Sequence, residues 1–391
     1  MKRKIIFITG ARSEYDIMYP VLTELKNRNN IELKLIVTGS HLSDEYGKTI
    51  VNIENDEFVI CEKIYNLISS NEKISRILSL SNQISILAHT LNREKPDIVV
   101  VVGDREEAIS VSLTCAYLSI PVAHFAGGDI ANDGNIDNAV RYATTKFSNI
   151  HFPFLEQHAD VLKKLGEEDF RIFCHGNPAL DKFINCDFID RSNLQILDQF
   201  IIDEEKFLIL IQHPIITDTS SSLQQIEETL EGILKTKYKC FINYPNSDPG
   251  NYHIINKIND YKNLYPKIFK VFKNLDRLNF INLLRHSSCL VGNSSSGIIE
   301  ASSIYLPVVN VGSRQRDRIS AGNVIYVDYN RHSISESILK SVNDINYRSY
   351  IKTLKNPYGD GHSAIKIANT LTDIIIDDRL IFKNITYKFK A

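Results

Sequence analysis

The sequence has no tryptophan, only two methionines and almost no net charge. Lysine and arginine number 45 against 47 aspartates and glutamates, which leaves a formal charge of -2 on 391 residues. A chain so balanced has no overall attraction to nucleic acid or to an acidic membrane, so we expect any bound anion to be held by a local cluster of side chains. The hydrophobic share of 43% and the charged share of 24% are typical of a soluble globular protein.

Paired cysteines are also lacking. Six cysteines stand singly, without the spacing of a CxxC pair or a zinc site: Cys61, Cys115, Cys174, Cys186, Cys240 and Cys289. We therefore predict reduced thiols in the core and no metal ion.

Long hydrophobic runs are absent as well. The basic start of the chain leads into the apolar run Ile5–Ile8, which Thr9 and Gly10 end after four residues. A secretory signal needs roughly 7–15 apolar residues, and a membrane-spanning helix needs about 18. We therefore expect a cytoplasmic protein.

What is present is a repeated alternation of short apolar runs and segments with helical spacing. Strands are predicted over 5–8, 31–37, 97–102, 121–125 and 150–152 and, after a pause at 176–178, over 207–211, 240–242, 289–291 and 308–310. This alternation favours parallel sheets, and the chain length suits two domains. We predict an α/β fold with two lobes, residues 1–178 and 179–362, and a closing helix and tail over 363–391.

The loops that follow the strands are the expected place for chemistry. Open α/β sheets bind ligands at the carboxyl ends of their strands. If the two lobes face each other, both sets of strand ends surround one interdomain active-site cleft.

The strongest local signal is the turn Gly292–Glu300, in which three serines join a predicted buried strand to a helix. Backbone N–H groups and hydroxyls at a helix start suit a diphosphate. Glu300, about one helical turn further on, can accept hydrogen bonds from ribose hydroxyls. A plain helix cap is the alternative.

Three arginines also follow predicted strands: Arg12 comes after the first strand, and Arg314 and Arg318 come after strand 308–310. The guanidinium group matches the geometry of phosphate. Each arginine alone is more often a solvated surface residue, but with the serine turn they predict a diphosphate pocket.

Acidic groups stand at other strand ends. Asp104 and Asp129 follow two neighbouring strands, and Asp137 precedes Arg141 by four residues, which puts both on one helix face. A turn residue and an ordinary surface ion pair are the alternatives. His213 directly follows strand 207–211, and its ordinary pKa suits proton transfer near neutrality, although a lone histidine is more often structural.

Together these motifs resemble those of a known family, the hydrolysing UDP-N-acetylglucosamine 2-epimerases of sialic acid biosynthesis, and relatives acting on diacetamido-trideoxy sugars for legionaminic acid. The matching stretches run nearly from end to end: Gly10–Tyr15, Gly39–Leu42, Gly103–Arg105, Gly127–Asp129, Gln212–Pro214, Gly292–Gly297 and Arg314–Gln315.

The resemblance implies two Rossmann-like lobes of the glycosyltransferase-B type, with UDP held mainly by the C-terminal lobe and a final helix that returns to the N-terminal one. It places UDP contacts at Arg12, Ser295, Ser296, Glu300 and Arg314, and catalytic residues at Asp104, Asp129, Asp137, Arg141 and His213. We add Arg105, Asn246, Ser294, Gly297 and Arg318 to the predicted UDP contacts.

The chain departs from the family pattern near one of these acids. Asp129 stands where hydrolysing relatives usually have Glu, the loop 130–136 is longer than in the sialic acid enzymes, and Asn138 replaces a second acid of some relatives. These changes bear on the identity of the sugar more than on the type of reaction.

The resemblance implies a reaction in which H2 is lost and UDP leaves by anti elimination, giving a 2-acetamidoglucal to which water adds. Because H2 is hardly acidic, the step depends on a stabilised leaving group, which Arg12, Arg314 and the serine turn would provide. No metal or redox cofactor is expected. The predicted partners are a UDP-sugar and further copies of the chain, as a homodimer or homotetramer.

Three aspartates would divide the proton transfers: Asp104, Asp129 and Asp137. We expect Arg141 to fix Asp137, and His213 to assist at the phosphate or to orient the sugar.

Three other functions stay open. Non-hydrolysing epimerases usually carry His-x-Glu-Ala-Gly, whereas His124–Gly128 lacks the glutamate, which favours hydrolysis. A UDP-sugar-dependent glycosyltransferase can use the same architecture, because fold does not fix function. The third is an inactive nucleotide-sugar-binding protein, against which the acids and His213 argue.

Overall fold

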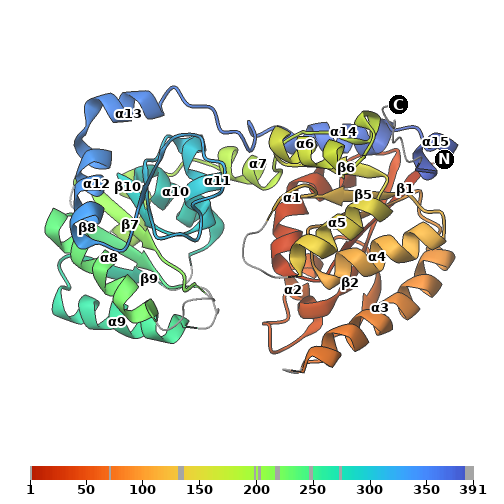
Figure 1. Ribbon diagram of the computed structural model, residues 1–391, viewed down its shortest axis with the longest axis horizontal. Coiled ribbons are helices and arrows are strands. Elements are labelled where there is room, and N and C mark those ends of the chain that lie inside the picture. The colour runs from red at the N-terminus through yellow and green to blue at the C-terminus, as the bar shows by residue number, and fades with distance from the viewer. Residues whose placement is uncertain are drawn as a thin grey trace, which may run out of the picture. The chain divides into compact units, whose positions relative to one another are not determined.

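The computed structural model describes residues 2–69, 72–130, 136–197, 200, 204–215, 221–245, 250–272 and 275–383. The chain divides into two compact units (Figure 1). The N-terminal unit combines Met1–Lys182 with Gly361–Ala391, and the C-terminal unit is Phe183–Asp360. The predicted bounds, 178 and 362, lie close to these divisions.

The N-terminal unit is built on a parallel sheet in the order β3-β2-β1-β4-β5-β6. Its strands are β1 (Arg3–Thr9), β2 (Ile31–Thr38), β3 (Ile60–Ile64), β4 (Ile98–Val102), β5 (Val122–Phe125) and β6 (Ile150–Phe152). Strand β4 is buried along its whole length, as expected for a strand covered on both faces.

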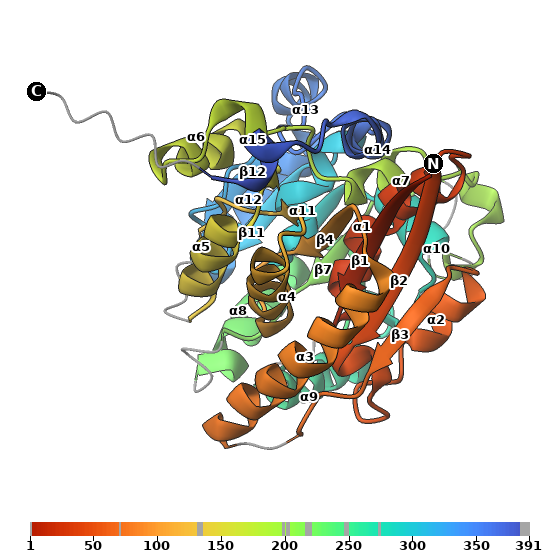
Figure 2. The ribbon, with the colours of Figure 1, turned by 90° about the vertical axis from the view of Figure 1, so that its right-hand side faces the viewer.

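Helices cover both faces of this sheet. They are α1 (Arg12–Lys26), η1 (Gly39–Leu42), α2 (Ile50–Asn55), α3 (Lys73–Glu94), α4 (Glu106–Tyr117), α5 (Asp137–Phe147), α6 (Glu156–Lys164), η2 (Asp169–Arg171), α14 (Ser363–Asp373) and α15 (Asp378–Ile381), with α7 (Ala179–Ile184) at the unit boundary. Helices α3, α4 and α5 lie side by side (Figure 2). Helix α14, far along the chain, packs against α1.

The end of the described chain is held by a buried arginine. Arg171 is fully buried, and its guanidinium group donates to the backbone oxygens of Arg379, Leu380 and Phe382 around the end of α15. Because the last carbonyls of a helix have no partner within the helix, this cation supplies the missing donors. The segment after α14 is therefore tied into the N-terminal unit.

The C-terminal unit repeats the same plan, with a parallel sheet in the order β12-β11-β10-β7-β8-β9. Its strands are β7 (Phe207–Ile211), β8 (Lys239–Asn243), β9 (Phe269–Phe272), β10 (Cys289–Gly292), β11 (Val308–Val311) and β12 (Val324–Val327). Its helices are η3 (Arg191–Asn193), η4 (Gln195–Leu197), α8 (Ser222–Thr236), α9 (Asn251–Leu264), α10 (Arg277–His286), α11 (Ser295–Ile299), η6 (Ala301–Ile304), α12 (Arg331–Asn343) and α13 (Ile345–Ile351).

The predicted α/β class with two Rossmann-like lobes is confirmed by these two sheets. Three strands escaped the sequence analysis: β3, β9 and β12. Each lies at the edge of its sheet and is only partly buried, so it lacks the continuous apolar run that marks the central strands. All six cysteines are free; Cys115, Cys240 and Cys289 are buried, and the other three are half-buried.

The strand order creates one switch point in each sheet. The strands of each sheet run parallel, but the direction in which the chain adds them to the sheet reverses between β1 and β4 in the first sheet and between β7 and β10 in the second. The loops after two such strands diverge to opposite faces and leave a crevice at the carboxyl edge, where ligands bind in open α/β sheets. The loops that carry Asp104 and His213 both start at these switch strands.

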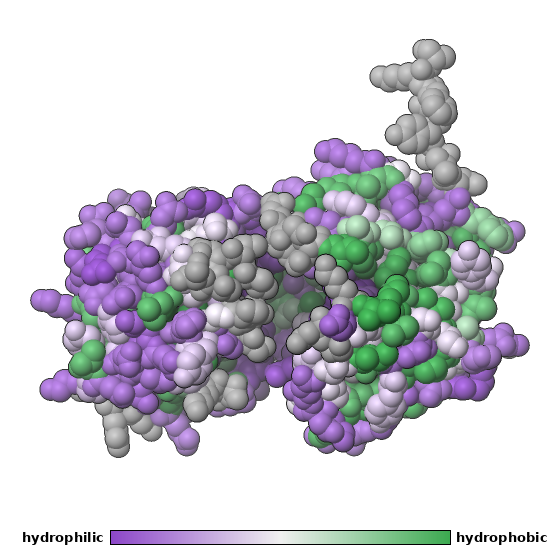
Figure 3. Space-filling view, turned by 60° about the horizontal axis from the view of Figure 1, so that its bottom comes forward, coloured by the Kyte–Doolittle hydropathy of each residue, from purple (hydrophilic) through white to green (hydrophobic). Residues whose placement is uncertain are grey.

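Hydrophobic side chains also gather on the surface (Figure 3). Exposed examples on α3 are Ile74, Ile77, Leu78 and Ile86. The predicted homo-oligomer stays a prediction.

Among the described residues, none of the helices is both long and apolar enough to cross a membrane.

Candidate active site

Arg141 on α5 joins two of the predicted catalytic loops in the N-terminal unit. Its Nη2 donates to Oδ2 of Asp104, after β4, and its Nη1 donates to the backbone oxygen of Asp129, after β5. Arg141 is only 5% exposed, and a buried cation is tolerated only when it is paired and hydrogen-bonded. The structure thus brings together Asp104, Asp129 and Arg141.

Asp137 opens the same helix and is half-buried in its first turn. A carboxylate suits this position because the helix dipole is positive there. The predicted pairing of Asp137 with Arg141 stays a prediction, whereas the salt bridge of Arg141 with Asp104 was not foreseen.

The second glycine of the pair before Asp129 is required by the backbone. Gly128 has φ 80°, and a Cβ atom there would lie 2.2 Å from the backbone oxygen of His158 on α6. The turn therefore lies directly on α6, which also brings Nε2 of His158 to 3.5 Å from Oδ1 of Asp129. Sequence analysis missed His158, since nothing in its local sequence marks it.

His124, beside the glycine pair, has a structural position. Its Nε2 lies 2.8 Å from the backbone oxygen of Gly103, and its Nδ1 lies 3.3 Å from the Thr145 hydroxyl. Burial lowers the pKa of His124 to about 3, so the ring is neutral near pH 7. A neutral ring that donates from Nε2 supports the loop of Asp104.

The two arginines of this unit that are predicted to contact UDP are exposed. Arg12 pairs with Asp16 one turn along α1 at 3.3 Å, and Arg105 lies 3.5 Å from Glu107. The Arg12–Asp16 pair is exposed on both sides and therefore weak, so the Arg12 guanidinium group can exchange its partner for a phosphate at small cost. The same argument does not hold for Arg105, because the Glu107 carboxylate is largely buried.

In the C-terminal unit, Asn293 ties the serine turn to His213. Its Oδ1 accepts from the backbone N–H of His213 at 2.7 Å, and its Nδ2 donates to the backbone oxygen of His213 at 2.9 Å. Gly292, just before it, has φ 118°, and a Cβ atom there would lie 2.1 Å from the Ile211 oxygen. The ends of β7 and β10 are thus held together.

The serine turn caps α11 and lies beside one predicted arginine. The Ser294 hydroxyl accepts from the Ser296 N–H at 3.3 Å. Arg314 donates from Nη1 to the Asn293 backbone oxygen at 3.1 Å, so its guanidinium group lies at this turn. Arg318 is exposed further along the same loop. The predicted contact Asn246 lies outside the described residues.

Glu300, at the end of α11, has one carboxylate oxygen occupied and one available. Oε1 accepts from Nη2 of Arg277 at 2.6 Å, whereas Oε2 is buried and has no hydrogen-bond partner among the described residues. A buried carboxylate oxygen without a donor costs free energy, which a ligand hydroxyl would recover. Arg277 was also missed, because it lies on α10, far from Glu300 in the sequence.

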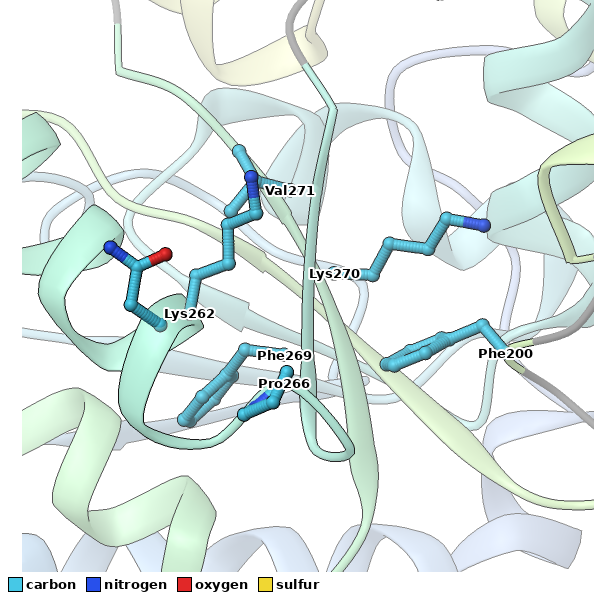
Figure 4. A pocket seen from close by; sticks show the side chains of 7 residues that line it. Phe200, Lys262, Pro266, Phe269, Lys270 and Val271 are labelled. Carbon is cyan, nitrogen blue, oxygen red and sulfur yellow. The ribbon is translucent and has the colours of Figure 1, made fainter.

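Neither a metal site nor a second ligand site is indicated by the remaining described residues. No group of three or more metal-ligating side chains occurs among the described residues. A surface depression of about 580 Å³ lies beside β9, where Lys262, Phe200 and Lys270 contribute to its lining (Figure 4). Phe269 in this depression begins β9, so the depression lies at the amino edge of the sheet, opposite to the serine turn.

Comparison with known proteins gives a coherent result. The family model of UDP-N-acetylglucosamine 2-epimerase matches residues 23–372. A Legionella pneumophila protein named UDP-N,N'-diacetylbacillosamine 2-epimerase (hydrolyzing) is 34% identical over 383 residues, which is 98% of this chain and 99% of that protein. A Campylobacter jejuni protein named GDP/UDP-N,N'-diacetylbacillosamine 2-epimerase (hydrolyzing) is 32% identical, covering 84% of this chain and 85% of its own.

Solved structures share the fold. The crystal structure of a UDP-GlcNAc 2-epimerase from Neisseria meningitidis, bound to UDP-GlcNAc, aligns with a TM-score of 0.75 at 24% identity. The alignment covers 94% of this chain and 99% of that one. The two-lobe architecture of this chain is therefore that of these enzymes.

The contact between the glycine pair and α6 can be tested with two matched glycines. Gly47 has φ 81° but open space around it, so Gly47→Ala should lower the free energy of unfolding by only about 1–2 kcal/mol through backbone strain. Gly128→Ala adds a clash with a backbone atom and should cost roughly 1–3 kcal/mol more. Urea denaturation measures both; equal losses would show that the turn does not lie on His158.

Proposed function

Because the chain belongs to the UDP-N-acetylglucosamine 2-epimerase family, we propose that it is a hydrolysing 2-epimerase, which converts a UDP-2-acetamido sugar into UDP and the free 2-epimer. The observation that carries the proposal is the buried Arg141, which gathers Asp104 and the loop of Asp129 at the carboxyl edge of the first sheet. Epimerisation at C2 requires a proton to be removed and returned, and acids placed together suit that task.

The names of two relatives favour one class of sugar as the substrate. Two relatives that are more than 30% identical to this chain are named for N,N'-diacetylbacillosamine, a 2,4-diacetamido-trideoxy sugar, and both are named hydrolyzing. We propose such a UDP-diacetamido sugar as the substrate, with UDP-N-acetylglucosamine as the alternative. The short Asp129 side chain leaves more room beside the sugar than a glutamate would.

The nucleotide would bind to the C-terminal unit. Glu300 Oε2 would accept from a ribose hydroxyl, since it is buried without a donor. The diphosphate would accept from Ser295 and Ser296 and from the Arg314 guanidinium group at the same turn. Arg12 and Arg105 would add charge from the N-terminal unit.

Chemistry would follow from holding the leaving group and moving a proton. Cations on the diphosphate stabilise the charge that develops as the C1–O bond breaks, which is the costly part of the elimination. A carboxylate removes H2, the resulting glycal loses the C2 stereocentre, and an acid returns a proton to C2 as water adds to C1. Asp104, Asp129 and Asp137 are proposed to share these transfers.

His213 would act beside the leaving group. Asn293 holds both the N–H and the carbonyl group of His213, so this residue lies next to the turn that is proposed to bind the diphosphate. A histidine there can supply a proton or a hydrogen bond to the departing phosphate. A cytoplasmic homo-oligomer also stays part of the proposal.

Incubation of the purified protein with the UDP-sugar in deuterated water tests the function. NMR should show UDP and a free manno-configured sugar carrying deuterium at C2. A UDP-linked manno sugar would instead indicate the non-hydrolysing reaction, and an unchanged substrate would indicate a binding protein.

The proposed proton transfers are tested by two variants, Asp129→Asn and Asp137→Asn. Each should slow turnover by roughly 10²-fold or more, because each removes a carboxylate that moves a proton. Undiminished turnover and deuterium exchange in both variants would contradict the aspartate mechanism.

The ribose contact gives a second test. Glu300→Gln should raise KM for the UDP-sugar roughly 10-fold or more, because a hydrogen bond to a charged group contributes about 1.5–3 kcal/mol. Arg277→Gln should act in the same direction by releasing the Glu300 carboxylate. Glu336→Gln, an exposed acid on α12, serves as the control. A 2′,3′-dideoxyribose analogue of the substrate should bind wild type and Glu300→Gln equally well. If Glu300→Gln still preferred the ribose form over this analogue as strongly as wild type does, the ribose contact would be contradicted.

A further inference from the structure

Two carboxyl groups that the mechanism does not use lie on either side of Gly10, at the switch point of the first sheet. Glu14, in the first turn of α1, is 6% exposed. Its Oε2 accepts from the Gly10 N–H at 2.8 Å and from the Ala11 N–H at 3.3 Å. One oxygen of Glu14 therefore organises the loop that leads to Arg12.

Glu107, at the start of α4, reaches the same glycine from the neighbouring loop. A Cβ atom on Gly10 would lie 2.4 Å from Oε1 of Glu107, and one on Gly39 would lie 2.6 Å from it. The carboxylate is thus seated on two residues without side chains, and its side chain is only 12% exposed. No other residue type at 10 or 39 leaves this space.

The second oxygen of Glu14 has no donor. Oε1 is buried and has no hydrogen-bond partner among the described residues. With both acids ionised, two negative groups would share a dry site and Oε1 would be left without a donor, which costs free energy. With one proton between them, one carboxyl group becomes a donor for the other.

The surroundings favour this single proton. Burial, with the charge of Glu107 as the next cause, raises the pKa of Glu14 to about 8. From η1, His41 contacts Thr9 next to this loop, but burial lowers its pKa to about 4, so it adds no charge near neutrality. From the start of α4, Arg105 pairs with Glu107 at 3.5 Å and stabilises the negative charge on that partner.

We propose that Glu14 is protonated at neutral pH and that its O–H group donates to the carboxylate of Glu107, which fastens the β1–α1 loop to the start of α4. The two loops carry Arg12 on one side and Asp104 with Arg105 on the other. Glu14 and Glu107 are therefore positioning residues for these groups. The catalytic consequence rests on the proposed function, whereas the shared proton does not.

The proton has a thermodynamic signature that needs no substrate. A carboxyl group with a raised pKa binds its proton in the folded state between pH 4.5 and about 8 but releases it on unfolding. Stability from this proton is complete below pH 4.5 and is lost as the pH rises through 8. Glu14→Gln keeps an acceptor and a donor without a titrating proton, so its stability should not fall in that window.

Melting temperatures across pH 5–9 test this directly. Wild type should lose about 4 °C or more relative to Glu14→Gln as the pH rises, and Glu24→Gln, on the same helix, should follow wild type. In ¹³C-glutamate spectra, one carboxyl resonance should titrate near pH 8 and vanish in Glu14→Gln. The shared proton would be contradicted if the melting temperatures of wild type and Glu14→Gln changed equally with pH, or if no carboxyl resonance titrated above pH 6.

Kinetics then test the positioning role. The wild-type kcat/KM should fall above pH 8, Glu14→Leu should lower it roughly 10-fold at pH 7, and Glu14→Gln should recover activity and keep it at higher pH. Glu107→Gln should shift the ¹³C titration of Glu14 downwards, which reports on the pair even if Glu14→Leu does not fold. A wild-type protein without epimerase activity but with the titration at pH 8 would refute the function alone.

Discussion

A buried guanidinium group is the constraint on which the first half of the site depends. Arg141 has little access to water, so its charge must be matched by acceptors that the fold provides. These acceptors are the Asp104 carboxylate and the Asp129 carbonyl, which come from the loops after two adjacent strands. A single helix residue thereby fixes the relative position of two loops that strand pairing alone would leave free to move at their tips.

In the second sheet, a neutral side chain holds the ends of two strands together. Asn293 donates to and accepts from the backbone of His213, so an amide joins the ends of β7 and β10. A neutral amide suits this position, because a charged side chain in its place would be attracted or repelled by a diphosphate bound at the serine turn. The Asn293 contact lies at the switch point of its sheet, between β7 and β10, where diverging loops open a crevice. The Arg141 contacts join the loop after β4, a switch strand, to the loop after its neighbour β5.

Sequence predicted the fold class, because buried central strands leave an unbroken apolar pattern. It also singled out the loops that begin where such runs end, and the function of those loops stays a prediction. It could not predict partners that meet only through the fold. Spacing by four residues suggested that Arg141 serves Asp137, yet its salt bridge goes to Asp104 on another loop. His158 beside Asp129, and Arg277 beside Glu300, carry no local signal, since each comes from a helix distant in the sequence.

The central claim is that a nucleotide diphosphate is held by the serine turn and Arg314 while aspartates of the other unit move protons at C2. The most direct measurement is a crystal structure of the Asp137→Asn protein with its UDP-sugar. The account predicts the diphosphate at Ser295, Ser296 and Arg314, and the sugar C2 beside Asp104 and Asp129. A diphosphate bound away from the serine turn, or a sugar ring remote from both aspartates, would contradict it.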